Sequence, residues 1–374
     1  MTSPGTPVVD PAATPLAREL TDRVRRQGPI TVADYMAACL LDPRHGYYRK
    51  REPFGVRGDF VTAPEVSQMF GELIGVWAVA TWEAMGSPDR FALVELGPGR
   101  GTLMADLLRA ARVRPAFRAA ATVHLVEASL RLRQIQAATL AACGCTPLWH
   151  DSLDDVPATP MLVIANEFFD ALPIHQLVAG AAGWAERFVA VGRDGALGYA
   201  EGPCFALAPP PGPAAPGTTA EVSLAARALT THLGMVLSDS GGAGIVVDYG
   251  YAGPAFGDTL QALYRGQPDH PLAHPGEADL TAHVDFGALA EAATTGGAAV
   301  HPLLTQAEFL GRLGIRERAE RLAAGKDAVT STAVGTALRR LTEPSEMGDL
   351  FKVLCISSGV FSVPAFDPPE RSGR

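Results

Sequence analysis

The stretch that most constrains the fold of this 374-residue chain is residues 91–103, FALVELGPGRGTL. A short apolar run is followed by an acid, by glycines at Gly97, Gly99 and Gly101, and then by residues compatible with a helix. Glycine permits both a turn with positive φ and the close approach of a ligand to bare backbone. The pattern therefore predicts a strand that turns sharply into a helix, with a nucleoside cofactor bound against the turn.

The spacing of these glycines narrows the choice of cofactor. A dinucleotide-binding fingerprint has glycines at positions one, three and six, whereas Thr102 occupies the sixth position here. The pattern ExGxGxG instead resembles that of class I S-adenosylmethionine-dependent methyltransferases. The resemblance implies that Glu95, Pro98 and the three glycines bind the cofactor. A glycine-rich turn without a ligand is the alternative for a motif this short.

A second apolar run, ATVHLVEAS at 121–129, predicts a buried strand that ends at Glu127. It follows the glycine loop by about one strand–helix–strand unit. Doubly wound folds place there the acid that accepts hydrogen bonds from ribose hydroxyls. We therefore expect Glu127 to bind the ribose of the cofactor, with a solvated acid at a strand end as the alternative.

Composition excludes several classes of protein. The chain is 47% hydrophobic and long enough to bury a full core. Its net charge of -9 argues against a nucleic-acid binder that works through a basic field. The five cysteines form no CxxC pair, so we expect no metal site. The N-terminus has neither a basic start nor an apolar run, which favours a soluble protein without a signal peptide.

Hydrophobic patterning predicts one α/β domain with additions. We expect a flexible tail at 1–15, a helical extension with a cofactor-covering loop at 16–90, and a Rossmann-like domain at 91–374. That domain would contain an insertion at about 175–240 and a helical segment at about 305–342. The predicted strands are 91–95, 122–126, 147–150, 161–165, 244–248, 298–302 and 351–357.

Eight sequence blocks in order, from about residue 58 to 354, resemble the MidA family of methyltransferases. They are GDFVTAPEVSQMFGELIGVW, ELGPGRGTLMADLLR, VHLVEAS, NEFFDALPIHQ, VDYGY, DTLQAL, PGEADLTAHVDF and MGDLFKVL. The resemblance implies a class I methyltransferase fold, a Rossmann-like sheet with an N-terminal helical extension and helical insertions, and S-adenosylmethionine as methyl donor. For the mitochondrial member it implies symmetric dimethylation of an arginine in the complex I subunit that helps form the quinone site.

The resemblance also implies that the loop at 58–65 folds over the cofactor. Asp59, Phe60, Thr62 and Glu65 are its expected contacts. An alternative is that this segment only starts a helix, with Thr62 as the cap and Pro64 in the first turn.

Candidate residues for binding the methyl acceptor follow the predicted strand at 161–165, in the order Asn166-Glu167-Phe168-Phe169-Asp170. Ligands of doubly wound folds bind beyond the carboxyl ends of such strands. A guanidinium is always cationic, so its site should offer carboxylates, which Glu167 and Asp170 provide. Helix capping by these acids is an equally supported alternative. We assign Asn166 to the same catalytic group and expect His283 on the substrate side.

Three functions compete at this point. The first is a protein-arginine methyltransferase whose partner is a quinone-site subunit of respiratory complex I or its equivalent. The second is a small-molecule methyltransferase, and the third is an assembly factor that binds the cofactor and holds a client. We expect no nucleic-acid partner and no membrane insertion. The expected location is the bacterial cytoplasm, or the mitochondrial matrix if the source is eukaryotic.

Overall fold

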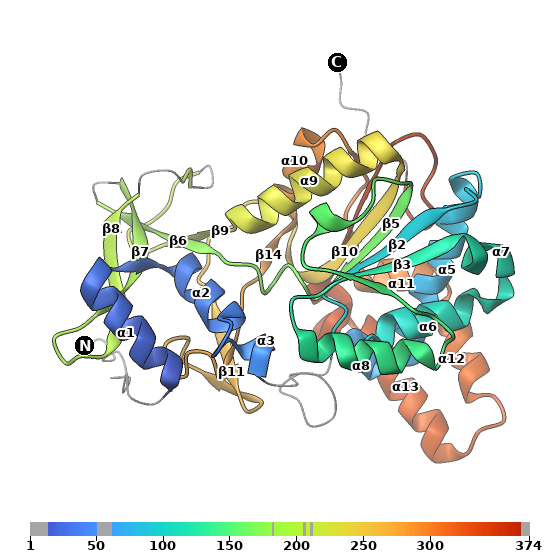
Figure 1. Cartoon of the computed structure of the whole chain (residues 1–374), viewed down its shortest axis with the longest axis horizontal. Helices are drawn as coiled ribbons and strands as arrows, with labels where there is room; N and C mark the ends of the chain where they lie inside the picture. The colour runs from blue at the N-terminus through green and yellow to red at the C-terminus, as the bar shows by residue number, and fades with distance from the viewer. Residues whose placement is uncertain (1–13, 51–61, 182, 205–206, 210–211, 368–374) are drawn as a thin grey trace. The chain divides into compact units, whose positions relative to one another are not determined.

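The computed structural model describes residues 14–50, 62–181, 183–204, 207–209 and 212–367. Packing divides the chain into two compact units, each made of three chain segments (Figure 1). The first unit comprises Met1–Phe60, Ala171–Ala226 and Pro254–His283. The second comprises Val61–Asp170, Arg227–Gly253 and Val284–Arg374.

A mostly parallel sheet forms the centre of the second unit, in the order β15-β17-β10-β5-β2-β3-β4. The five strands from β10 to β4 are parallel, and β17 runs antiparallel to both β10 and β15. Two short strands, β14 and β16, pair with β10 and β17. The bounds are β2 (Phe91–Leu96), β3 (Ala121–Val126), β4 (Leu148–His150), β5 (Met161–Asn166), β10 (Gly242–Tyr251), β14 (Val284–Asp285), β15 (Ala299–Val300), β16 (Leu304–Thr305) and β17 (Phe351–Ser357).

This strand order confirms the predicted class I methyltransferase fold. Chain order reverses between β2 and β5, which creates the switch point where doubly wound sheets bind ligands. All residues of β2 and β5 are buried, as expected for continuous apolar runs covered on both faces. The ligand-binding edge is therefore the one where β2, β3, β5 and β10 end.

Helices cover this sheet and also form the predicted helical segment at 305–342. Their bounds are α4 (Ala63–Val66), α5 (Gln68–Ala84), α6 (Thr102–Ala110), α7 (Pro115–Ala120), α8 (Leu130–Ala141), α9 (Leu224–Ser240, in this unit from Arg227), α10 (Phe286–Thr295), α11 (Gln306–Arg312), α12 (Ile315–Ala323) and α13 (Ala328–Thr342). Three shorter turns are η1 (Ala111–Val113), η2 (Leu153–Asp155) and η3 (Pro344–Gly348).

Two glycines let α5 pack closely on α6. A Cβ atom at Gly71 would lie 2.6 Å from Cβ of Asp106, and one at Gly75 would lie 2.8 Å from the carbonyl oxygen of Leu107. Any side chain at these positions would separate the helices. The close approach also brings the polar side chains of the two helices into direct contact.

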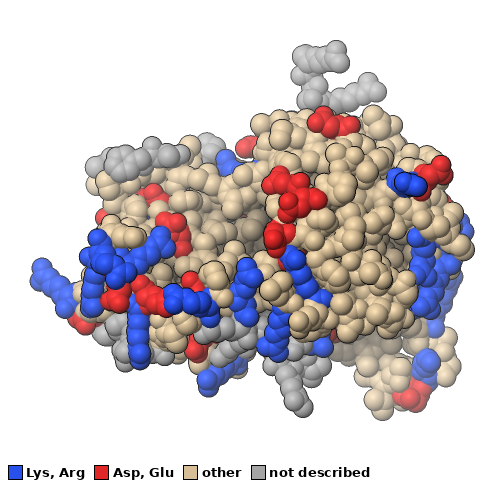
Figure 2. All heavy atoms as spheres, viewed as in Figure 1, with Lys and Arg blue, Asp and Glu red and all other residues tan. Residues whose placement is uncertain are grey.

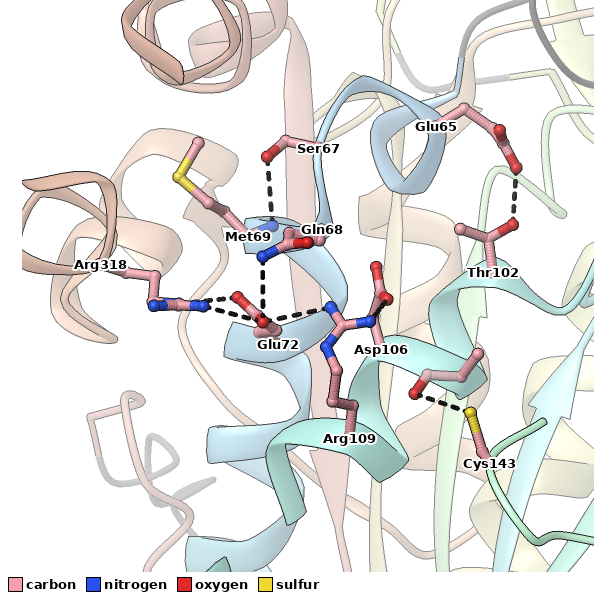
Figure 3. A network of polar contacts seen from close by, with 11 residues as sticks. Glu65, Ser67, Gln68, Met69, Glu72, Thr102, Asp106, Arg109, Cys143 and Arg318 are labelled. Atoms are coloured by element: carbon pink, nitrogen blue, oxygen red, sulfur yellow. Dashed lines mark hydrogen bonds and ion pairs between the residues drawn. The ribbon is translucent and has the colours of Figure 1, made fainter. Parts of the chain in front are cut away.

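A buried carboxylate joins three helices of the second unit. Glu72 of α5 accepts hydrogen bonds from Arg109 Nη2 of α6 at 3.1 Å and from Arg318 Nε of α12 at 2.7 Å. Figure 3 shows the two arginines reaching this carboxylate from opposite sides, with Asp106 paired to Arg109. Burial raises the pKa of Asp106 to about 6, although Arg109 opposes the shift. This cluster fastens α12 to a helix 246 residues away along the chain.

A Glu72→Ala variant is expected to lower the free energy of unfolding by about 2 kcal/mol, because Arg318 loses its buried partner and Arg109 keeps only Asp106. The loss is smaller than for a fully buried pair, since the Arg109 and Arg318 side chains are 37% and 32% exposed. Urea unfolding followed by circular dichroism measures it. The control is Glu83→Ala, on the same α5 helix, which removes an exposed ion pair with Arg114. It should lower the free energy of unfolding by less than about 1 kcal/mol. Equal losses would contradict a special role for Glu72.

Within its described residues, the first unit combines three helices with two antiparallel sheets. The larger sheet has the order β1-β7-β6-β9, with β8 paired to β7, and the smaller has the order β12-β11-β13. The bounds are α1 (Pro15–Gln27), α2 (Val32–Leu41), α3 (Tyr47–Lys50), β1 (Ile30–Thr31), β6 (His175–Gly180), β7 (Gly183–Val191), β8 (Leu197–Pro203), β9 (Thr219–Val222), β11 (Gln261–Tyr264), β12 (Gln267–Asp269) and β13 (Asp279–Thr281). Thr31 caps α2 as predicted, accepting a hydrogen bond from the N–H of Asp34.

The predicted insertion at about 175–240 has a mixed character in the structure. Strands β6 to β9 occupy 175–222, and helix α9 then begins at Leu224. Strand β7 is half-buried and pairs with β1, more than 150 residues earlier in the chain. The predicted domain boundaries follow the chain, whereas each compact unit gathers three segments. Those boundaries stay a prediction.

The surface of the first unit carries charges of both signs. Figure 2 shows Lys and Arg side chains beside Asp and Glu side chains where α1 and α2 lie. Among the helices that the structure describes, none is long and apolar enough to cross a membrane.

Candidate functional site

The loop between β2 and α6 has the backbone conformation that its glycines predict. Gly97, Gly99 and Gly101 have φ angles of 63°, 51° and 80°, in the left-handed region that favours glycine. A Cβ atom at Gly97 would also lie 2.6 Å from Cδ2 of Phe168. The predicted sharp turn from strand to helix is confirmed.

Two buried polar side chains lie at the carboxyl ends of the neighbouring strands β2 and β5. Glu95 is 3% exposed and Asn166 is 8% exposed. Glu95 Oε2 and Asn166 Oδ1 have no hydrogen-bond partner within the part of the chain that the structure describes. Burial raises the pKa of Glu95 to about 8. Acceptors of this kind suit a ligand that brings donors and positive charge to the switch point, as the amine and sulfonium of S-adenosylmethionine do.

Glu127 follows β3 and is held in one orientation. It is 8% exposed. Its Oε1 accepts a hydrogen bond from the N–H of Ser129 at 2.7 Å, and its Oε2 accepts one from Nε2 of Gln136 at 3.1 Å. A fixed carboxylate beside the glycine loop is the arrangement that ribose recognition requires.

Glu167 begins the turn after β5 in an unusual backbone conformation. Its φ is 49°, in the left-handed region that residues with a side chain seldom adopt. Its Oε1 accepts hydrogen bonds from the N–H of Ala63 at 2.9 Å and from Nδ2 of Asn166 at 3.2 Å. Burial raises the pKa of Glu167 to about 7 and Asp170 adds to the rise, while both hydrogen bonds and Arg340 oppose it. The side chain is therefore poised to exchange a proton near neutral pH.

Helix α4 is fastened at two points of this edge. Its first N–H, from Ala63, donates to Glu167, and its Glu65 accepts a hydrogen bond from Oγ1 of Thr102 at 2.7 Å (Figure 3). Thr62 precedes the helix, and its carbonyl oxygen accepts hydrogen bonds from the N–H groups of Glu65 and Val66. Its side chain makes no capping hydrogen bond. The other predicted loop contacts, Asp59 and Phe60, lie outside the described residues.

Asp248, near the end of β10, makes backbone contacts that the sequence did not indicate. Its Oδ2 accepts hydrogen bonds from the backbone N–H groups of Phe168, Phe169 and Asp170, at 3.0–3.2 Å. Burial raises its pKa well above the usual range, and the charges of Asp170 and Glu167 add to the rise. Asp248 thereby shapes the turn that displays Glu167 and Asp170. An acid at the end of the next parallel strand is the sequence signal that could have suggested it.

His283 belongs to the first unit. Its backbone N–H donates to Oγ1 of Thr259 at 2.9 Å, and burial lowers its pKa. Its predicted place on the substrate side stays a prediction.

A groove of about 610 Å³ lies elsewhere on the second unit, over α5, α6 and α12. Glu72, Arg109 and Arg318 are among its lining residues, and none of the predicted site residues is. The groove is therefore distinct from the edge where the strands end.

The carboxyl edge of the second unit's sheet thus gathers four predicted elements: the glycine loop, Glu95, Glu127 and the acids after β5. The acids come from three neighbouring strands, and Asp248 adds a fourth strand. Such an edge can bind a cationic nucleoside on one side of the switch point and present carboxylates to a second cation on the other.

Comparison with known proteins gives the same picture. A family profile described as "Putative S-adenosyl-L-methionine-dependent methyltransferase" matches residues 73–303. The mitochondrial protein arginine methyltransferase NDUFAF7 of Mus musculus is 38% identical over 369 residues, which span 90% of this chain and 83% of the relative. Its homolog in Drosophila melanogaster is 37% identical over 383 residues, spanning 93% and 86%.

A solved structure covers nearly the whole chain. It is a "likely methyl transferase" from Burkholderia thailandensis bound to S-adenosyl-homocysteine, with a TM-score of 0.81 and 29% sequence identity. The match spans 96% of this chain and 95% of that one.

Proposed function

Because this chain belongs to the family of S-adenosyl-L-methionine-dependent methyltransferases, we propose that it methylates the guanidinium of an arginine in a protein substrate. Two of its relatives carry the name protein arginine methyltransferase. The cofactor is S-adenosyl-L-methionine, as the family indicates. The similar Burkholderia structure binds S-adenosyl-homocysteine, the same molecule without the transferred methyl group.

The observation that carries the proposal is the pair of acids after β5 together with Asp248 of β10. Glu167 and Asp170 lie in one turn, and Asp248 organises that turn through the backbone. Asp170 raises the pKa of Glu167, and both raise the pKa of Asp248, as expected for acids that share one small region. A guanidinium stays protonated near neutral pH and binds to carboxylates through its planar fork of donors. A positively charged guanidinium bound here would reduce the repulsion between these carboxylates.

The cofactor residues follow from the same edge. We assign Gly97, Pro98, Gly99 and Gly101 to the loop under the methionine part of the cofactor. Glu95 contributes a buried acceptor, and Glu127 accepts hydrogen bonds from the ribose. Asn166 stays with the proposed catalytic residues, as the donor to Glu167. Thr62 precedes α4, close in the chain to Asp59 and Phe60, and we assign all three to the cover over the cofactor.

S-adenosyl-L-methionine supplies an electrophilic methyl group on its sulfonium. Glu167 and Asp170 hold the guanidinium fork and direct one nitrogen, which brings nucleophile and methyl carbon into line. Since the bond from that nitrogen to carbon forms as the carbon–sulfur bond breaks, the nitrogen must lose a proton. Glu167 accepts it, because its pKa of about 7 leaves a large fraction ionised at neutral pH.

The protein substrate is proposed to be the quinone-site subunit of respiratory complex I, or its equivalent in the source organism. This proposal extends the resemblance to the MidA family. The bacterial cytoplasm stays the predicted location of this chain, although the relatives described above are mitochondrial.

The test uses tritiated S-adenosylmethionine and lysate from a strain that lacks the gene. Purified wild type should label one protein band, and hydrolysis of that band should yield symmetric dimethylarginine. A Gly99→Val enzyme serves as the control that cannot label. Label found only in small molecules would favour a small-molecule methyltransferase. Absence of label despite measurable cofactor binding would favour an assembly factor that holds its client.

A further inference from the structure

Gln136 of α8 connects the glycine loop, the acid after β3 and the edge strand β4 in the second unit. Its side chain is fully buried. Its Nε2 donates to the carbonyl oxygen of Gly99 at 2.8 Å and to Oε2 of Glu127 at 3.1 Å. Its Oε1 accepts a hydrogen bond from Nε1 of Trp149 on β4, at 2.9 Å. One amide thus contacts the glycine loop, the acid after β3 and the edge strand.

The indole of Trp149 decides which way this amide points. A glutamine amide has an oxygen that accepts and a nitrogen that donates two hydrogens, and the two ends have nearly the same shape. An indole N–H can only donate, so it requires the amide oxygen of Gln136 on its side. Both amide hydrogens then face Gly99 and Glu127, which each offer an acceptor. A rotated amide would set its oxygen against two acceptors and its nitrogen against a donor.

We infer that Gln136, oriented by Trp149, is the positioning residue that aims the Glu127 carboxylate at the ribose and so sets the preference for a cofactor with free ribose hydroxyls. This rests on the proposed assignment of Glu127. The N–H of Ser129 holds one carboxylate oxygen and Gln136 holds the other, so the plane of the carboxylate is fixed before ligand arrives. Ligand binding then avoids the entropy cost of ordering that side chain.

The experiment measures the affinity of S-adenosylhomocysteine and of its 2′,3′-dideoxy analogue by calorimetry, and takes their ratio. For wild type we expect a ratio of about thirtyfold, since hydrogen bonds from the hydroxyls to a carboxylate are lost in the analogue. Gln136→Leu should weaken S-adenosylhomocysteine about tenfold and the analogue less than about threefold, so the ratio falls. The control is Gln134→Leu, at an exposed position of the same helix, and it should leave both affinities unchanged.

Trp149→Phe provides a milder variant that keeps the aromatic ring and removes the N–H. It should lower the ratio about threefold, because the amide oxygen of Gln136 loses its donor and the amide is then held only by its bonds to Gly99 and Glu127. In the Gln136→Leu background the same change should have no further effect on the ratio, since Trp149 acts through Gln136. If Gln136→Leu does not fold, the affinity ratio of Trp149→Phe still tests the inference.

Glu127→Ala separates failure of this inference from failure of the ribose assignment. If Glu127→Ala keeps the wild-type ratio, Glu127 does not bind the ribose and the proposed assignment is wrong. If Glu127→Ala abolishes the preference while Gln136→Leu or Trp149→Phe weakens both ligands equally, Gln136 serves only the fold and the inference is overturned.

Discussion

A Gly99→Val enzyme is expected to remain folded and to lose affinity for S-adenosylhomocysteine by at least about a hundredfold, which corresponds to about 2.7 kcal/mol. Gly99 has a φ of 51°, a conformation that a β-branched residue adopts only with strain. Its carbonyl oxygen is also held by Gln136 at 2.8 Å, so the loop has little freedom to adjust. The branched side chain would therefore occupy the space that the cofactor needs. Calorimetry measures the affinity, and the melting temperature checks the fold.

Gly144→Val is a matched control for the strain itself. Gly144 has a φ of 68°, and a Cβ atom there would meet nothing within 4 Å. This variant should lose stability comparable to that lost by Gly99→Val, yet bind S-adenosylhomocysteine like wild type. Retained affinity in Gly99→Val would rule out the glycine loop as the cofactor site.

Glu167→Gln is expected to lower kcat by about 10²–10⁴-fold and to leave the affinity for S-adenosylhomocysteine within about threefold of wild type. The amide oxygen can still accept from the N–H of Ala63, so α4 keeps its attachment. What disappears is the negative charge that receives the proton. A rate near that of wild type would remove Glu167 from the reaction.

The pH dependence gives a second readout for the same residue. Because burial raises the pKa of Glu167 to about 7, wild-type kcat should rise with pH through about 7 as the carboxyl ionises, and Glu167→Gln should lack this limb. The sign for stability is opposite. Because the pKa of Glu167 is higher in the folded state, its protonated form stabilises the fold at pH values below the ordinary pKa of about 4.3. That stabilisation is lost as the pH rises toward 7.

Much of the second unit could be predicted because its signals are local. Continuous apolar runs identified β2, β3, β5 and β10, and the glycine spacing identified the turn after β2. Glu127 and Glu167 could be proposed because each directly follows such a strand. In each case the residues that carry the signal are neighbours in the sequence.

Features that depend on distant partners could not be predicted. Asp248 acts on backbone N–H groups about 80 residues earlier, and backbone groups leave no trace in a side-chain pattern. The pairing of Glu72 with Arg318 spans 246 residues. Gln136 lies in no motif. Its importance follows only from its full burial and its hydrogen bonds to Gly99, Glu127 and Trp149. Strand β1 of the first unit likewise pairs with β7, more than 150 residues later in the chain.

The hydrogen bond from the N–H of Ala63 to Glu167 couples the position of α4 to the protonation of the Glu167 carboxyl. This N–H is one of the groups that lower the pKa of Glu167, so any displacement of α4 that breaks the bond makes the carboxyl hold its proton more tightly. Thermodynamic linkage then works in reverse: protonation of Glu167 weakens the attachment of the start of α4, and ionisation strengthens it. The ionisation state that accepts the proton from an arginine is thus also the one that keeps this helix closed over the strand ends.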